Sequence, residues 1–206
     1  MGRPAKRGER EQRSDAAHNR DVLVRAATAA VHREGVRVRM STIAADAGVG
    51  VGTLYRHFAT REELFDHLTQ RSFAMVLDNA TAAENGVSTG SDALRQFIEA
   101  AIRLREHLVL PLHGGPPITD PATIAVRDQV HRTIERLIDR GHRDGTIKAA
   151  VTPQDIVTLG ALLAQPRSYG PGWNATCRRI LSTYLSGLAS IGTADAESPE
   201  DPAELT

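Results

Sequence analysis

The chain has 206 residues, of which 41% are hydrophobic and 24% charged, and its Lys and Arg equal its Asp and Glu at 25 each. This ordinary globular composition excludes a membrane-spanning protein, because no apolar run approaches about 20 residues, and the basic, polar start excludes a signal peptide. The single cysteine, Cys177, cannot form an intramolecular disulfide, so we expect a protein of the reducing cytoplasm.

Charge is distributed unevenly along the chain. Residues 1–75 hold 13 Lys/Arg and 9 Asp/Glu, a net charge of +4, whereas residues 76–206 carry a net charge of −4. Attraction to phosphate is a property of one surface, so this excess predicts a nucleic-acid-binding N-terminal part. Residues 1–18 are polar and basic, and we expect a flexible arm there. Its Arg3, Lys6 and Arg7 are candidates to enter a DNA minor groove.

Two helices are predicted next, over about 19–34 and 40–47. In the first, apolar residues from Leu23 to Val31 recur at the spacing of one buried helical face, and Gly35 supplies the stop. The second is short, with Ile43 on its inner side.

The eleven residues 48–58 are typical of the turn and second helix of a helix-turn-helix. Gly48 can end the preceding helix with a positive φ. Leu54 and Phe58 are four residues apart, so they share one face, which we expect to be buried. The residues then left to face outward are Val51, Gly52, Thr53, Tyr55 and Arg56. A helix that exposes an aromatic hydroxyl and a guanidinium is suited to contact a partner, and DNA is the first candidate.

A fourth helix is predicted from Thr60 to about Ala83, where Thr60 and Glu63 have the spacing of a capping box. It closes a small core around Ile43, Leu54 and Phe58. We therefore divide the chain into an arm (1–18), a helix-turn-helix DNA-binding domain (19–70), a larger helical domain (71–191) and an acidic, disordered tail (192–206).

Four further helices are predicted over 91–108, 120–143, 152–164 and 173–190. Ser91 is the expected N-cap of the first. Asp120-Pro121 and Thr152-Pro153 each place a capping side chain before a proline at the first helical position. The predicted fold class is thus all-α, with about nine helices.

The last two predicted helices are apolar on nearly every side. Such helices lie in the centre of a core or are half buried by a partner. We favour a four-helix interface between two subunits over an intrachain core. The predicted homodimer interface consists of Ile156, Leu159, Leu163, Ile180, Leu181, Tyr184, Leu185 and Leu188.

Five short motifs follow one another between residues 43 and 64. They are Ile43-Ala44, Ala47-Gly48-Val49, Gly52-Thr53-Leu54-Tyr55, His57-Phe58 and Arg61-Glu62-Glu63-Leu64. As a set, in this order and spacing, they resemble the TetR family of bacterial transcriptional regulators over roughly a quarter of the chain. The resemblance implies an all-α homodimer whose N-terminal domain binds double-stranded operator DNA. It also implies a C-terminal ligand-binding and dimerisation domain that holds a small-molecule effector.

The resemblance further implies roles for single residues. Family positions that contact the DNA backbone or bases are matched by Met40, Ser41, Thr53, Tyr55 and His57, and a phosphate-holding position is matched by Arg61. Arg56 occupies a variable position that often reads sequence, and an arginine there can donate two hydrogen bonds to guanine.

Two departures from the family pattern, Gly50 and Val51, belong to the predicted DNA contacts, as does the outward-facing Gly52. Gly50 stands where Ser or Thr is common, so it can cap the helix only through its backbone. Val51 offers an apolar contact, for example to a thymine methyl group.

Arg105, His107 and His113 flank a loop rich in proline and glycine, and they are candidates to line the effector pocket. A solvated helix end is the alternative. The histidines show no metal-binding spacing, and we find no nucleophile–base pair or cofactor motif. We therefore predict no catalytic residues, no metal and no cofactor.

Three functions follow from these observations. The leading hypothesis is a homodimeric repressor that a small-molecule effector releases from a palindromic operator. The second is a DNA-binding regulator without such an effector, constitutive or controlled by a protein. A small helical enzyme ranks far behind, because no catalytic motif supports it.

Overall fold

The computed structural model describes the backbone of residues 5–86, 89–166, 170 and 172–190, and the side chains of these ranges from residue 19 to residue 189. Over these ranges it contains eight α-helices, two short 3-10 helices and no strand. They are α1 (Ala5–Glu34), α2 (Met40–Asp46), α3 (Val51–His57), α4 (Arg61–Glu84), α5 (Gly90–Leu104), η1 (Arg105–His107), η2 (Pro111–His113), α6 (Pro121–Arg143), α7 (Pro153–Leu163) and α8 (Trp173–Ser190). The all-α prediction is confirmed, with eight described α-helices where about nine were expected.

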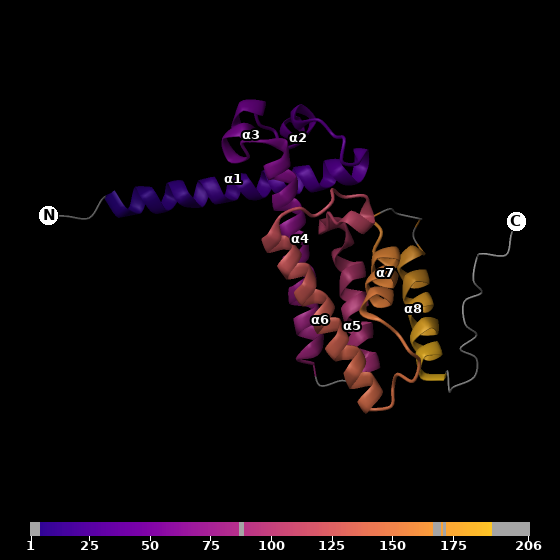
Figure 1. Cartoon of the computed structure of the whole chain (residues 1–206). Helices are drawn as coiled ribbons and strands as arrows, with labels where there is room; N and C mark the ends of the chain where they lie inside the picture. The colour runs from indigo at the N-terminus through magenta and orange to yellow at the C-terminus, as the bar shows by residue number, and fades with distance from the viewer. Residues whose placement is uncertain (1–4, 87–88, 167–169, 171, 191–206) are drawn as a thin grey trace, which may run out of the picture.

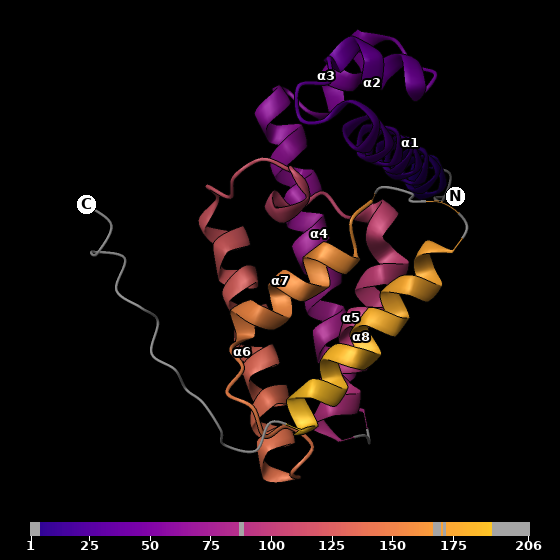
Figure 2. The same cartoon turned by 90° about the vertical axis from the view of Figure 1, so that its right-hand side faces the viewer.

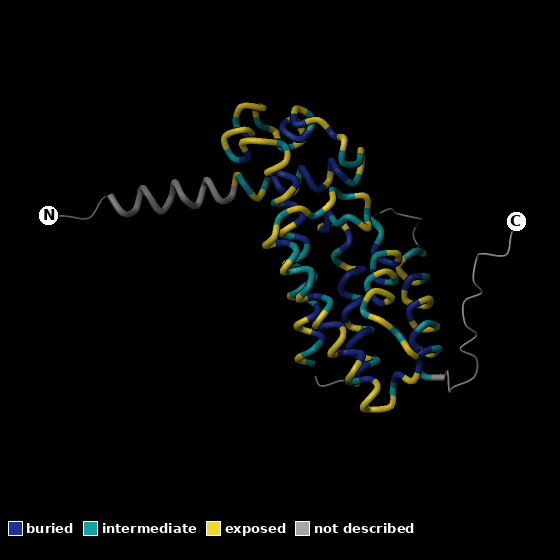
Figure 3. The backbone as a smooth tube through the Cα atoms, in the orientation of Figure 1, coloured by how far each residue is buried: buried dark blue, intermediate teal, exposed yellow. Residues whose placement is uncertain are grey.

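The helices form an upper and a lower lobe, which share α4 (Figure 1). Helices α1 to α3 pack around the first turns of α4, with Leu64 and Leu68 in the upper core. The same helix continues downward, where Ala80 and Ala83 join the lower core with α5, α6, α7 and α8. Figure 2 shows α7 and α8 side by side on one face of the lower lobe. Most of the buried residues, whose backbone is dark blue in Figure 3, belong to these two cores.

Three of the predicted helix starts are confirmed by their caps. The side chains of Thr60, Asp120 and Thr152 each accept a hydrogen bond from the backbone N–H three residues on. Such a bond satisfies one of the four N–H groups that a helix start leaves open. Because caps are local, they can be recognised without knowing the tertiary structure.

Helix α5 begins differently from the prediction. Its cap is Thr89, whose hydroxyl accepts from Asp92 N at 3.2 Å, and not Ser91. Gly90 is therefore the first helical residue, and it lies directly against Gly141 of α6. The predicted cap, Ser91, lies two residues later. The local sequence could not show the true start, because Gly90 is placed by its contact with a segment about 50 residues away.

Helix α1 corrects the predicted arm. It begins at Ala5 and not at Asn19, so most of the segment 1–18 is helical. Good helix formers such as Ala, Arg, Gln and Glu dominate this stretch, and no proline follows Pro4. Residues 1–4, the side chains of residues 5–18 and the tail 192–206 lie outside the described residues, so the roles of Arg3, Lys6 and Arg7 stay predictions.

No helix in the described part of the chain is both long enough and apolar enough to cross a membrane.

Candidate nucleic-acid interface and internal cavity

The turn between α2 and α3 has the geometry that its glycines predict. Gly48 adopts φ +69°, a left-handed conformation that costs glycine little, and its N–H donates to Ala45 O. Gly50 is the N-cap of α3 with φ −69° and ψ 147°, and no side chain caps this helix. Gly50 therefore contributes only its backbone, as expected: its carbonyl accepts from Thr53 N at 2.9 Å, and no side chain caps the N–H groups of Val51 and Gly52.

Helix α3 separates a buried face from an exposed one. Leu54 and Phe58 are 0% exposed, whereas Val51 is 41% and Tyr55 45% exposed. Of the remaining predicted contacts, Gly50, Gly52 and Arg56 are exposed and Thr53 and His57 are half-buried. A Cβ added at Gly50 or Gly52 would meet nothing within 4 Å, so this stretch of backbone is open to close approach from outside.

Arg20 of α1 contacts the end of α3, a role that the sequence did not predict. Its guanidinium donates from Nη1 to His57 O at 3.3 Å and lies 4.3 Å from the Phe58 ring centroid. The ring of His67 also packs against the Phe58 ring, and the two ring centroids are 5.4 Å apart. Burial, followed by the charge of Arg20, lowers the pKa of His67. Arg20 lies one turn before Leu23 on the buried stripe of α1, which is the signal that could have revealed it.

Arg61 does not take the position predicted for a phosphate contact. Its Nη1 and Nη2 atoms donate to the carbonyls of Val38 and Val36, and its guanidinium lies 4.5 Å from the Phe65 ring centroid. The side chain thus holds the turn between α1 and α2. The Thr60 cap follows the prediction, but the Glu63 carboxylate accepts from Ala59 N at 2.7 Å and not from the cap residue itself.

We expect Arg61→Met to lower the free energy of unfolding by about 1.5–3 kcal/mol, because two charge-assisted hydrogen bonds to backbone are lost. Arg56→Met is the matched control, since Arg56 is exposed, and it should change stability by less than about 0.5 kcal/mol. Urea unfolding of both variants measures the difference. Equal stabilities would show that Arg61 is not a structural tie.

The start of α2 also differs from the prediction. Met40 is 7% exposed and packs in the upper core, so its side chain is not available for a DNA contact, whereas Ser41 is exposed. The N-cap of α2 is Arg39, which makes no side-chain cap, and Arg37 and Arg39 are both exposed. These two arginines are candidate phosphate contacts that the sequence analysis did not name. Their alternation with buried Val38 was the available signal.

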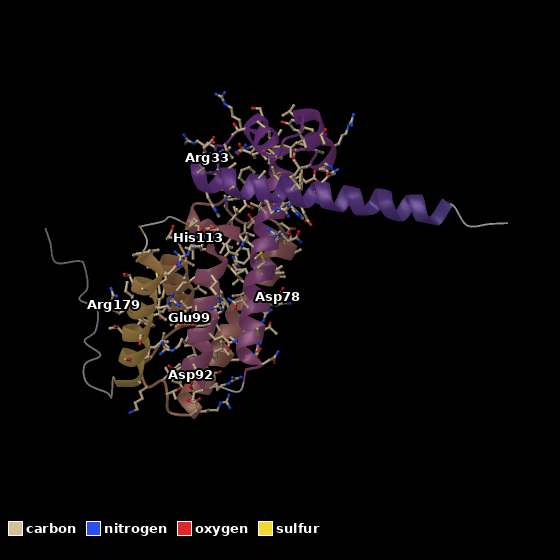
Figure 4. All side chains as sticks on the ribbon, turned by 180° about the vertical axis from the view of Figure 1, so that it is seen from behind. Arg33, Asp78, Asp92, Glu99, His113 and Arg179 are labelled. Atoms are coloured by element: carbon tan, nitrogen blue, oxygen red, sulfur yellow. The ribbon has the colours of Figure 1, made fainter. Side chains whose placement is uncertain are left out.

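The lower lobe encloses a cavity of about 380 Å³ between α4, α5, α6, α7 and η2. His113 lines it, as predicted, and Figure 4 shows this residue just below the upper lobe. Arg105 and His107 do not line it, which corrects two predicted ligand contacts. Arg105 is buried, with its Nη2 donating to Asn174 at 2.8 Å, and His107 is exposed at the end of η1.

The segment between η1 and η2 connects this cavity to the upper lobe. Leu108 lines the cavity, and its carbonyl accepts from His32 Nε2 of α1 at 2.8 Å. Val109 N donates to the Ser72 hydroxyl of α4 at 2.8 Å, and the Val109 side chain packs in the upper core. One wall of the cavity is thus bonded to both α1 and α4.

The local sequence of the upper lobe matches a known family model. Residues 23–68 match the model of bacterial regulatory proteins of the tetR family. The match covers the helices that build the exposed face of α3. Over these residues the chain is similar to the TetR family of transcriptional regulators.

Relatives and solved structures show the same likeness. An HTH-type transcriptional regulator of Staphylococcus aureus strain USA300 is 32% identical over 93 residues, which are 41% of this chain and 50% of the relative. The chain thus matches about half the length of such curated relatives. A TetR transcription regulatory protein from Mycobacterium vanbaalenii is 27% identical with a TM-score of 0.58, covering 86% of this chain and 98% of that one.

The fold extends beyond the matched domain. A TetR-family protein from Rhodococcus RHA1 has a TM-score of 0.67 at 19% identity and covers 86% of this chain and 98% of its own. At this identity the likeness concerns the fold alone. The described residues hold no group of three or more potential metal ligands.

Most of the predicted dimer contacts are already buried by the chain itself. Within this one chain, five of the eight are already buried in the lower core: Ile156, Leu163, Leu181, Leu185 and Leu188. Leu159 and Tyr184 are partly buried, and Ile180 is 42% exposed. Leu162, which was not predicted, is 60% exposed. The exposed apolar surface of α7 and α8 is therefore narrower than predicted, and it includes Leu162, which was not among the predicted contacts.

Proposed function

We propose that this protein is a DNA-binding repressor of the TetR type in the cytoplasm, that two copies bind a palindromic operator, and that a small-molecule effector releases them. The observation that carries the proposal is the exposed face of α3, which presents Val51, Tyr55 and Arg56 above the fully buried Leu54 and Phe58. A buried base that fixes the orientation of the helix and an outer face of hydrogen-bond donors suit insertion into a major groove.

The contact chemistry divides between positioning and sequence reading. The Tyr55 hydroxyl and His57 imidazole can donate to phosphate oxygens, as can the exposed Arg37 and Arg39. Arg56 can donate to guanine O6 and N7, which is worth about 1–3 kcal/mol of discrimination. The open backbone of α3 at its glycines lets this helix approach the DNA closely. Arg61 and Met40 have no part in this proposal, because both are committed to the protein itself.

Dimerisation through α7 and α8 supports the palindromic operator. The exposed Leu162 and Ile180 are accompanied by the partly buried Leu159 and Tyr184. A second copy would cover these side chains, which gain free energy on leaving water at roughly 25 cal/mol per Å² of apolar surface. Arg179 is exposed on the same helix (Figure 4) and supplies part of a polar rim.

Selection of bound duplexes from random DNA tests the proposal. We expect an inverted repeat whose half-sites are about 10 base pairs apart, or a multiple of that, because two recognition helices enter successive major grooves. A single non-repeated site would contradict the dimer. Failure to enrich any sequence would contradict DNA recognition by α3.

Release requires a physical connection from the cavity to α3, and the 108–109 segment is the connection we propose. An effector that displaces Leu108 moves the carbonyl bonded to His32 of α1 and the N–H bonded to Ser72 of α4. The first residues of α4 lie directly after α3, so their displacement changes the separation of the two recognition helices. The effector shifts the population only as far as it prefers the released arrangement.

Ser72→Ala should lower the free energy of unfolding by about 1–3 kcal/mol, because the buried N–H of Val109 loses its acceptor. Ser41→Ala is the control, since Ser41 is exposed and should change stability by less than about 0.5 kcal/mol. Urea denaturation reports both values. If Ser72→Ala is as stable as the control, the bond does not tie the cavity wall to α4.

A further inference from the structure

The wall of the cavity indicates which class of effector it accepts, an inference that rests on the proposed function. Of the nineteen residues that line it, all but five are apolar or glycine. Its volume of about 380 Å³ lies near the lower end of the roughly 300–1,000 Å³ that is usual for small-molecule sites. Such a cavity suits a compact, mainly apolar molecule, since apolar walls leave a polar ligand's hydrogen bonds unmade.

The charged groups of the wall neutralise one another. Arg127 is the wall's one arginine and is accompanied by no lysine. It donates from Nε and Nη2 to Asp128 Oδ1 at 3.0 and 2.7 Å. Both side chains are two-fifths or more exposed, which places the pair toward solvent. The other titratable wall residues are His113 and His131, and Gln154 is uncharged. A carboxylate or phosphate would therefore enter without an unpaired arginine to hold it, and its dehydration would go uncompensated.

Among the residues that line the cavity, His113 holds a buried ring nitrogen that has no hydrogen-bond partner in the described residues. Its Nε2 lies 3.1 Å from Ala161 O, and a carbonyl only accepts, so Nε2 carries the proton. Burial, the main cause, lowers the pKa of His113, so the ring is neutral at physiological pH. Its Nδ1 is consequently a hydrogen-bond acceptor. That atom is buried and receives no hydrogen bond from the described residues.

We propose that the effector is an uncharged, predominantly apolar alcohol or phenol whose hydroxyl group donates a hydrogen bond to His113 Nδ1. Its ring or short chain packs against walls such as Phe97, Leu108 and Val157. The hydroxyl supplies the donor that Nδ1 lacks, and the paired Arg127 and Asp128 need not be disturbed. Because His113 and Leu108 lie at the two ends of one segment, the ligand also contacts the connection to α1 and α4.

Isothermal titration of the full chain with matched probes tests the chemical class. The first set is 2-naphthol, its methyl ether and 2-naphthoate, at about pH 8, where histidine is ordinarily neutral. The ether keeps the ring but lacks the O–H donor. We expect 2-naphthol to bind about tenfold more tightly than the ether, as one hydrogen bond to a buried acceptor allows, and 2-naphthoate to bind more weakly than either. Cyclohexyl and octyl sets, each with alcohol, methyl ether and carboxylate, repeat the comparison on other shapes.

Two variants assign the preference to His113. His113→Leu should bind the alcohol and the ether with equal affinity, because both bonding atoms are gone. His113→Gln should retain the preference, since its amide can donate to Ala161 O and its carbonyl can accept from the ligand. As controls, the affinity for the ether and the far-UV circular dichroism spectrum should be the same in both variants as in the wild type. This would show that both variants fold and keep the cavity.

The outcomes separate this inference from the proposed function. Tighter binding of a carboxylate, binding of no alcohol of any set, or an alcohol preference that survives His113→Leu would overturn the effector class. DNA selection could still succeed in each of these cases. Conversely, a chain that binds alcohols as expected but enriches no duplex would refute the proposed repressor and leave the cavity chemistry in place.

Discussion

Gly90→Ala is expected to destabilise the protein by about 3 kcal/mol or more, which makes it one of the most damaging single changes in the lower lobe. A Cβ built on Gly90 would lie 2.1 Å from Gly141 N, 2.3 Å from Gly141 Cα and 2.8 Å from Leu137 O. All three are backbone atoms of α6, so no side chain can rotate out of the way. Helices α5 and α6 would have to separate and lose contacts along the lower core.

Gly52→Ala is the matched control for Gly90→Ala. Both glycines lie in the first turn of a helix, but a Cβ at Gly52 meets nothing within 4 Å. Alanine there should raise stability by up to about 1 kcal/mol, because glycine loses more backbone entropy on folding. Urea unfolding of the two variants should thus give changes of opposite sign. Similar small changes in both would show that α5 and α6 are not in close contact at Gly90.

Tyr55→Phe is expected to weaken binding to the selected operator by about tenfold or more, if the proposed phosphate contact exists. A hydrogen bond from a hydroxyl to a charged acceptor is worth about 1.5–3 kcal/mol, and phenylalanine removes only the hydroxyl. Tyr55 is 45% exposed, so the stability of the free protein should not change. Thr81→Val removes an exposed hydroxyl from the part of α4 in the lower lobe, so it is the control and should bind DNA as the wild type does.

The salt dependence of binding distinguishes this contact from a charged one. Tyr55→Phe removes no charge, so the slope of log affinity against log salt should stay as in the wild type. Arg39→Ala removes one proposed phosphate contact and should reduce that slope by about one. Mobility-shift titrations at several salt concentrations measure both slopes. Unchanged affinity in Tyr55→Phe would remove Tyr55 from the interface, and an unchanged slope in Arg39→Ala would do the same for Arg39.

The sequence predicted well those features that depend on neighbouring residues. The caps at Thr60, Asp120 and Thr152, the left-handed Gly48 and the buried pair Leu54 and Phe58 all follow from spacings of at most four residues. Side chains three or four residues apart meet on a helix, and a cap bonds to its own first turn. The exposed face of α3 can therefore be predicted without the tertiary structure.

Features that depend on distant partners could not be predicted in this way. Arg61 was predicted to hold phosphate from its position in the motif. Its actual acceptors, the carbonyls of Val36 and Val38, lie more than twenty residues earlier, so the local sequence did not reveal them. The last two helices are apolar on several sides, so the pattern could not say which side its own chain covers. The structure assigns Leu181 and Leu185 to the lower core and leaves Ile180 exposed.

By itself, the sequence determined the all-α class, most helix boundaries and the exposed face of α3, because each of these arises from contacts within one or two helical turns. Only the tertiary structure decided where the cavity lies, that His113 lines it while Arg105 and His107 do not, and that Leu108 and Val109 join it to α1 and α4. A cavity and its connections are made by segments that lie far apart along the chain. Their relative positions depend on how whole helices pack, which no local pattern specifies.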